Sequence, residues 1–170
     1  MINPTIVDNF FDNFENIKDS FKNIKMYDNE EYNKHFENNG KWPGFRSQDL
    51  YDSNKFLWNL IVKEFEQKFN NPLRGQKYWL KGYTHLRLEN MNDWIHTDPN
   101  YATLMVYLSN TNLKSGTCLY NENKELTSTV NFVQNRAFLF NGKTNHMSLN
   151  NHGTDINNGR LTLNCFIHIE

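Results

Sequence analysis

Hydrophobic residues in the first part of the chain recur at the three- and four-residue steps of a helix. Residues 9–24 carry the first such stripe, which would line one helix face: Phe10, Phe14, Ile17, Phe21 and Ile24. A second stripe over residues 52–69 predicts another helix, with Asp52 or Ser53 as its cap. Its expected inward-facing residues are Phe56, Leu57, Leu60, Ile61 and Phe65. Glycine and proline between the helices predict a loop over residues 37–47.

From residue 77 onward the hydrophobic segments become short, rich in β-branched and aromatic residues, and bounded by Gly, Asn or Pro. Eight strands are expected, over residues 77–89, 93–98, 102–109, 116–122, 128–133, 136–142, 146–151 and 160–170. No helical pattern separates them, which favours a two-sheet jelly roll or a barrel over a sheet of βαβ units. We therefore predict a mainly β fold with N-terminal helices packed on the outside of one sheet.

Composition limits the size and the surroundings of the protein. A chain of 170 residues with 15% aromatics and 38% hydrophobics suits one domain. We divide it into a helical N-terminal support, residues 1–76, and a β core, residues 77–170. A formal charge of -1 without any basic block argues against nucleic acid as a partner. No signal peptide or long apolar run is present, so we expect no membrane contact and a cytoplasmic location, or the host cytoplasm if the protein is viral.

The two cysteines, Cys118 and Cys165, are too few for a disulfide framework or a zinc-thiolate site. We expect them to be free, half-buried thiols.

The sequence His-Thr-Asp at residues 96–98 offers a possible metal clamp. On a strand, residues two apart point to the same face, so His96 and Asp98 can converge on one ion. A facial triad needs a second histidine. His146 is the best candidate because it begins a strand just after a turn centred on glycine, and His152 is a second choice. Two imidazoles and a carboxylate favour Fe(II) in a cell, although Mn, Co, Ni or Zn would fit the same ligands.

The last predicted strand carries residues suited to binding a carboxylate. Arg160 has a planar, permanently charged guanidinium that can hold a carboxylate in a bidentate fashion. Thr162, two residues further on, shares its face and can add a hydroxyl hydrogen bond, and Asn164 continues the same face. Together these residues predict a carboxylate-binding pocket.

Four pieces of sequence, taken in order, resemble the Fe(II)- and 2-oxoglutarate-dependent dioxygenases, and among them the prolyl-hydroxylase-like branch with its uncharacterised bacterial and phage members. They are "HTD" at 96–98, "ATLMVYLS" at 102–109, "SGTCLY" at 115–120 and "NHMSLNNHGTDINNGRLTLNCF" at 145–166. The resemblance covers residues 77–170, over half of the chain.

The resemblance implies a double-stranded β-helix with Fe(II), 2-oxoglutarate and O2 as cofactor and cosubstrates. The implied iron ligands are His96, Asp98 and His146. By the same likeness Arg160 pairs with the distal carboxylate of 2-oxoglutarate, Tyr107 places its phenol against that carboxylate, and Thr162 fits the Ser or Thr that follows the arginine. The implied reaction is hydroxylation of an unactivated C–H bond of an amino-acid-like or peptidyl substrate, with release of succinate and CO2.

The chain departs from the prolyl hydroxylases in the loop 150–159, which is longer and leaves the substrate open. His85 and Arg87 share one strand face and can reach the pocket, and Trp94 either walls the site or fills the core. Asp93 and Glu89 are expected to be solvated. The oligomeric state is not predicted.

Two other classes of function stay open at this stage. One is a non-enzymatic jelly roll, such as a viral or structural protein, that binds a sugar or a protein. The other is a cupin-type isomerase with a different metal. We favour the oxygenase because Arg160 and Thr162 would be superfluous in either alternative.

Overall fold

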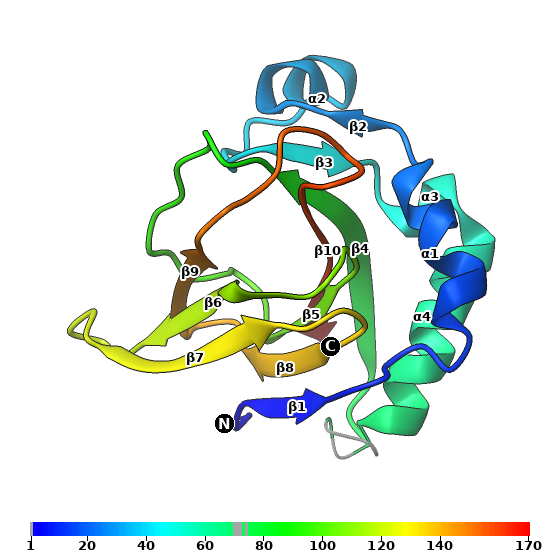
Figure 1. Cartoon of the computed structure of the whole chain (residues 1–170). Coiled ribbons are helices and arrows are strands. Elements are labelled where there is room, and N and C mark those ends of the chain that lie inside the picture. Colours follow the sequence, from blue (N-terminus) through cyan, green and yellow to red (C-terminus); the bar gives the residue numbers. More distant parts are fainter. Residues whose placement is uncertain (1, 70–72, 74) are drawn as a thin grey trace.

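Two antiparallel sheets face each other, and helices cover the outer face of the larger sheet (Figure 1). The computed structural model describes residues 2–69, 73 and 75–170. The larger sheet has the strand order β1-β8-β5-β10-β4-β3-β2, and the smaller has the order β7-β6-β9. This arrangement is the mainly β, double-stranded β-helix fold with helices on one sheet, as the sequence and the resemblance predict.

The described elements have the following bounds. The helices are α1 (Phe14–Lys22), α2 (Asn29–His35), α3 (Leu50–Ser53) and α4 (Lys55–Lys68). The strands are β1 (Thr5–Val7), β2 (Met26–Tyr27), β3 (Phe45–Ser47), β4 (Tyr78–Arg87), β5 (Ala102–Tyr107), β6 (Asn112–Tyr120), β7 (Leu126–Phe132), β8 (Ala137–Asn141), β9 (Asn145–Leu149) and β10 (Arg160–Ile169).

Strand β10 lies at the centre of the larger sheet, between β5 and β4, and its two faces differ in polarity and in what they contact. One face is apolar and packs in the core beneath the helices, through Leu161, Leu163, Cys165 and Ile167. Because successive residues of a strand alternate between faces, the other face points toward the smaller sheet and is polar: Arg160, Thr162 and Asn164. The helices thus stabilise the sheet from behind and leave its inner face free for chemistry.

A second, smaller apolar cluster fills part of the space between the two sheets. Its members come from β5, β6, β7 and β8: Met105, Tyr107, Leu119, Val130, Phe132, Phe138 and Phe140. Cys118 and Cys165 are free thiols, as predicted, but both are buried and not half-buried, because each lies on the central strand of its sheet, between two neighbouring strands.

The N-terminal segment differs from the prediction because it is not helical throughout. Strands β1, β2 and β3 belong to it and extend the larger sheet at both edges. Strand β3 lies at the end of the predicted loop 37–47 and pairs with β4. Short strands of two or three residues carry no readable alternation, so only the neighbouring strand reveals them.

Two details of the predicted second helix are wrong. The side chain that caps α4 is Asn54, which accepts a hydrogen bond from the Leu57 backbone N–H, whereas Asp52 and Ser53 belong to α3. Phe56 points outward and is 67% exposed, because the buried stripe is narrower than the run of hydrophobic residues.

Residues 93–98 were predicted as a strand, and this prediction is also wrong. Within this segment only His96 makes a β-bridge. The backbone around Trp94 bonds to side chains instead, because its N–H donates to the Asp93 carboxylate and its carbonyl contacts the His96 ring.

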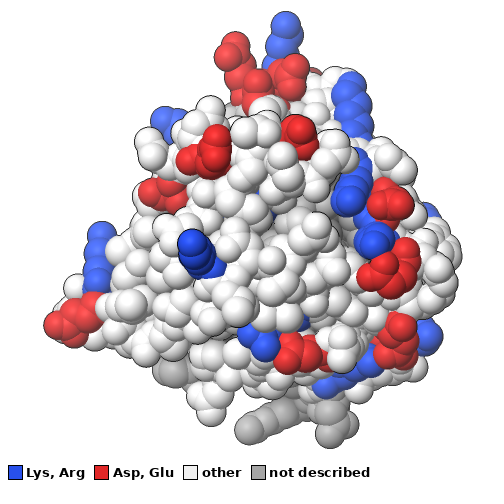
Figure 2. Space-filling model, viewed as in Figure 1, with Lys and Arg blue, Asp and Glu red and all other residues white. Residues whose placement is uncertain are grey.

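The surface in the view of Figure 2 carries acidic and basic side chains intermingled over the helical side, while the area over the sheets is mostly uncharged. No helix among the described residues is long and apolar enough to cross a membrane.

The helix–sheet core predicts unequal costs for two phenylalanines of α4. Phe65 is 1% exposed and packs against Phe69 and Tyr78. We expect Phe65→Ala to lower the free energy of unfolding by about 3–5 kcal/mol. The matched change Phe56→Ala, on the exposed side of the same helix, should alter it by no more than about 0.5 kcal/mol. Urea unfolding followed by circular dichroism measures both, and equal losses would contradict this packing.

Candidate metal centre

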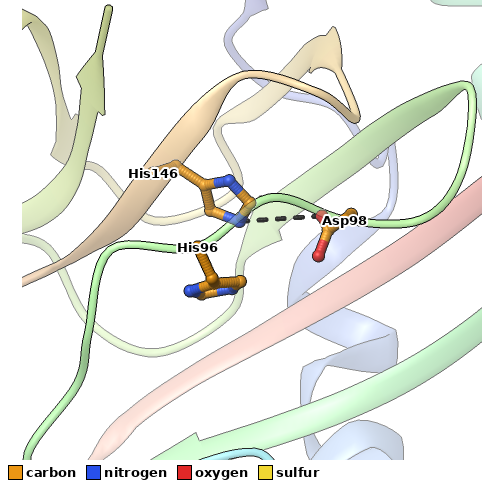
Figure 3. A group of neighbouring side chains, drawn as sticks. All are labelled: His96, Asp98 and His146. Atoms are coloured by element: carbon orange, nitrogen blue, oxygen red, sulfur yellow. Dashed lines mark ion pairs between the residues drawn. The ribbon is translucent and has the colours of Figure 1, made fainter. Parts of the chain in front are cut away.

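Three side chains that the sequence predicts as metal ligands lie together at one end of the space between the sheets. His96 and Asp98 come from the segment between β4 and β5, and His146 comes from β9 (Figure 3). One ligand atom from each lies within 4.8 Å of the others. The Nε2 atom of His146 is 3.6 Å from Asp98 Oδ2, and the two imidazole rings are 4.4 Å apart. The group could hold one metal ion.

Backbone hydrogen bonds bring these residues together. The N–H of His96 donates to the His146 carbonyl over 3.1 Å, and the N–H of His146 donates back over 2.8 Å. The N–H of Asp98 donates to the carbonyl of Gly142. At Gly142 a Cβ would lie 2.2 Å from the Asn100 carbonyl oxygen, so only glycine allows this approach. The site therefore depends on main-chain geometry and not on the ligands alone.

Both imidazoles are held in the orientation that metal binding needs. The Nδ1 atom of His96 lies 2.8 Å from the Trp94 carbonyl oxygen, and that of His146 lies 2.9 Å from the Thr144 carbonyl oxygen. A carbonyl only accepts, so Nδ1 carries the proton and the lone pair of Nε2 is free for a metal. Burial lowers the pKa of His146, with the Asp98 carboxylate opposing this, and the neutral form is the one that binds metal.

The Asp98 carboxylate is supported by a buried chain of hydrogen bonds. The Thr103 hydroxyl donates to Asp98 Oδ2 over 2.6 Å, and the Asn100 amide donates to the same hydroxyl over 3.0 Å. Such partners fix the direction of a ligand's lone pairs. Thr103 and Asn100 are not among the site residues predicted from the sequence. The signal available was one polar residue, Thr103, inside the apolar run at 102–108.

The cluster opens into a cavity of about 510 Å³, within the range of small-molecule sites. The inner face of the larger sheet forms one wall, through His85 and Arg87 of β4 and Arg160, Thr162 and Asn164 of β10. The segment 93–100 and β9 form the opposite wall.

Arg160 is a buried cation at the side of this cavity. It is 2% exposed, and its Nη2 donates to the Gly116 carbonyl and to the Thr117 hydroxyl, over 3.0 and 3.1 Å. Its Nε has no hydrogen-bond partner, and no ion pair among the described residues includes it. Burial lowers the pKa of Arg160 to about 10, so it is charged at neutral pH. At Gly116 a Cβ would lie 2.3 Å from the Val130 carbonyl oxygen, so a larger residue would disturb this support.

Thr162 and Tyr107 lie in different positions relative to the cavity. Thr162 lines it and donates its hydroxyl hydrogen to Asn164 Oδ1 over 2.8 Å. Tyr107 is fully buried behind the wall, and its hydroxyl lies 2.9 Å from Thr117 Oγ1 and 2.9 Å from the Val130 carbonyl oxygen. Thr117 lines the cavity, so the phenol reaches the cavity through Thr117.

The expectation that Asp93 is solvated is wrong, whereas Glu89 is exposed as predicted. Asp93 forms a buried ion pair with Arg87 Nη1, and it accepts hydrogen bonds from the backbone N–H and the hydroxyl of Ser148, each 2.7 Å. Burial raises the pKa of Asp93, but the Arg87 charge and the Ser148 hydrogen bonds outweigh this and hold the pKa below its ordinary value. Arg87 thus ties β4 to the segment that carries the ligands.

Two other candidates from the sequence lie outside the ligand group. Trp94 is 47% exposed and lies at the cavity wall beside His96. His152, the second choice for the third ligand, packs edge-on against Phe132 and is not part of the metal-ligating group.

No protein-family model matches this sequence, and no curated protein does. Solved structures do match. HygX from Streptomyces hygroscopicus, with nickel and 2-oxoglutarate bound, is 13% identical over 97% of this chain and 82% of its own, with a TM-score of 0.70. The α-ketoglutarate-dependent epimerase SnoN from nogalamycin biosynthesis is 12% identical over 97% and 78%, with a TM-score of 0.66.

A prolyl hydroxylase from Trichoplax adhaerens, in complex with a peptide fragment of hypoxia inducible factor, is 11% identical over 99% of this chain and 84% of its own, with a TM-score of 0.61. The chain therefore has the fold of the Fe(II)- and 2-oxoglutarate-dependent oxygenases. The resemblance seen in the sequence is confirmed at the level of the fold.

The ligand geometry predicts that His146 is required for metal binding and that His152 is not. We expect the wild-type protein to bind one equivalent of Mn(II) in isothermal titration calorimetry. His146→Ala should abolish this binding because it leaves only two ligands, whereas His152→Ala should retain it. Retention of tight binding by His146→Ala would exclude this ligand set.

The support of Asp98 predicts a weaker effect from a residue that does not touch the metal. Thr103→Val keeps the side-chain shape but removes the hydroxyl donor, and we expect Mn(II) affinity to fall about 10- to 100-fold with unchanged stoichiometry. Thr84→Val is the matched control, because Thr84 is equally buried in the same sheet and its hydroxyl has no hydrogen-bond partner. A similar loss in both variants would mean that sheet packing, and not the contact with Asp98, sets the affinity.

Proposed function

We propose that this protein is an Fe(II)- and 2-oxoglutarate-dependent oxygenase. The observation that carries the proposal is the presence, in one cavity, of a His-Asp-His group and a buried arginine that forms no ion pair with any described residue. The first suits a divalent metal and the second suits a carboxylate. Either feature alone is compatible with many functions, but together they match the needs of a chelating keto acid.

The residues fit both groups. Two neutral imidazoles and one carboxylate on one side of an ion suit Fe(II) and leave coordination positions open. His96, Asp98 and His146 would hold the metal. The unsatisfied Nε of Arg160 offers a charge-assisted hydrogen bond to the distal carboxylate of 2-oxoglutarate. When bound, the iron with 2-oxoglutarate and O2 would supply the oxidising chemistry, with succinate and CO2 as coproducts.

The chain itself would position and shield the reactants. Arg160 orients 2-oxoglutarate by its charge and fork geometry, and Thr162 can turn its hydroxyl from Asn164 toward the same carboxylate. Tyr107 fixes Thr117, which in turn contacts Arg160. The apolar cluster between the sheets, defined above, keeps water from the rear of the site.

Hydroxylation of an amino-acid-like or peptidyl C–H bond is the outcome we propose. It is supported by the likeness to a prolyl hydroxylase solved with a peptide. The same fold also occurs in an epimerase, so oxidation is the common element and hydroxylation the more specific proposal. A cupin-type isomerase or a non-enzymatic binding protein would have no use for Arg160. A cytoplasmic location and the absence of nucleic acid stay predictions.

The test is an anaerobic titration of the protein with Fe(II) and then 2-oxoglutarate. Chelation of the metal by the keto acid should produce a weak visible charge-transfer band, and admission of air should convert 2-oxoglutarate to succinate. His96→Ala should lose both signals. Metal binding without any band would favour the isomerase, and a protein that binds no metal would remove the oxygenase proposal.

Arg160 should act on the cosubstrate and not on the metal. We expect Arg160→Gln to lower the affinity for 2-oxoglutarate by a factor on the order of 10 to 100, as for loss of a hydrogen bond to a charged group. The affinity for Mn(II) should be unchanged. Arg136→Gln is the control, because Arg136 is paired with Asp8 near the surface. Equal 2-oxoglutarate affinity in all three proteins, measured by calorimetry, would sink the assigned role.

A further inference from the structure

A second cation faces the cavity away from the oxoglutarate end. Arg46 of β3 lines the cavity together with Trp42 and with Lys81 and Tyr83 of β4. None of these residues has a role in binding the metal or in the proposed binding of 2-oxoglutarate. They form what we call the outer subsite.

The Arg46 guanidinium is held in a cage of three aromatic rings. Its Cζ lies 3.6 Å from the ring centre of Trp42, 4.4 Å from that of Tyr32 and 4.5 Å from that of Tyr83. Such faces stabilise a cation and hold its plane in a fixed direction. Arg46 is therefore a fixed group and not a mobile surface side chain.

The cage leaves the hydrogen-bonding capacity of Arg46 incompletely used. Its Nε is buried without a hydrogen-bond partner, and no ion pair among the described residues includes Arg46. The Tyr32 and Tyr83 hydroxyls and the Asp49 carboxylate interact electrostatically with the guanidinium, but none of them gives its Nε a hydrogen-bond partner. A buried donor without a partner is costly, so the geometry suits an acceptor supplied by a ligand.

His85 connects the outer subsite to the oxoglutarate end. It pairs with Arg46 on one neighbouring strand and with Thr162 on the other, so the three side chains share one sheet face. Strands lie about 4.8 Å apart, and the row from Thr162 to Arg46 therefore spans about 10 Å. Both ring nitrogens of His85 are buried without a partner. A ligand that lies along this row would meet polar groups over its whole length.

The charges that line the cavity are unequal. Its acidic residues are Asp93, which is paired with Arg87, and Asp98, which belongs to the metal centre. Arg160 is assigned to 2-oxoglutarate. Arg46, Lys81 and Lys41 then remain as cations without an acidic partner in the cavity. An anion is the ligand that would balance them.

We propose that the prime substrate carries an anionic group, a carboxylate or a phosphate, which binds to Arg46 in the outer subsite. The proposal rests on the oxygenase function, because it names the class of molecule oxidised at that site. Arg46 anchors the anion by charge and hydrogen bonding, and His85 contacts the part of the substrate that extends toward the metal. A neutral peptide segment would leave Arg46 unpaired.

The test uses protein saturated with Ni(II) and 2-oxoglutarate, so that Arg160 is occupied and no turnover takes place. Three probes are titrated while tryptophan fluorescence is followed: N-acetylglycine, its neutral amide N-acetylglycinamide, and inorganic phosphate. We expect saturable binding of at least one anion and none of the amide. The anion that binds identifies the group as carboxylate or phosphate.

Substitutions then locate the binding. Arg46→Gln should lower the affinity for the anion by a factor on the order of 10 to 100. Arg46→Lys keeps the charge but loses the planar guanidinium, so it should give an intermediate loss of affinity. Lys143→Gln, a change of the same charge at an exposed residue that does not line the cavity, should weaken anion binding less than about threefold. Circular dichroism confirms that each variant is folded.

Several outcomes would overturn the proposal. They are equal binding of the amide, no saturation by either anion up to on the order of 50 mM, unchanged binding in Arg46→Gln, or an equal loss in Lys143→Gln. The affinity for 2-oxoglutarate is measured in the same samples. If the wild-type protein does not bind 2-oxoglutarate, the oxygenase function is overturned. If it binds 2-oxoglutarate but no anion, only the role of Arg46 is overturned.

Discussion

A reciprocal pair of backbone hydrogen bonds between His96 and His146 is the constraint on which the candidate site depends. It joins an irregular segment to β9 at one residue only, and at that residue both partners are the proposed ligands. The buried ion pair of Asp93 with Arg87 adds a second attachment, because Asp93 also bonds to Ser148 on β9. Together with the hydrogen bond from the Asp98 N–H to the Gly142 carbonyl, these contacts set the positions of the ligands in a segment that is not a regular strand.

The central strand β10 separates stability from chemistry. Its apolar residues pack under the helices, and its polar residues face the cavity. Because side chains alternate strictly along a strand, neither set can change sides without a shift in register that would move every residue. Arg160, the first residue of β10, is therefore held in place by the packing of that strand against the helices. Its position does not depend on the loops around the cavity.

The sequence was sufficient for what depends on local pattern and on chemically specific residues. The strands from 77 onward and the meeting of His96, Asp98 and His146 follow from alternation and motif order, although the segment holding His96 is not a strand. Strands β1 to β3 depend on pairing partners far away in the chain. The Asn54 cap and the support of Asp98 by Thr103 depend on the conformation of one side chain. Arg46 is the clearest case, since its cage is assembled from residues 32, 42 and 83.

The buried polar atoms that lack a hydrogen-bond partner explain why the cavity wall is polar and not apolar. Buried donors without partners are few in folded proteins, and each costs about 1–3 kcal/mol. Here Nε of Arg160, Nε of Arg46 and both nitrogens of His85 are such atoms, and all three residues line one cavity. A fold that kept such groups for packing alone would be more stable with apolar residues in their place. Their clustering along one sheet face, beside a group of metal-binding residues, is instead what a site requires when its ligands complete the hydrogen bonds.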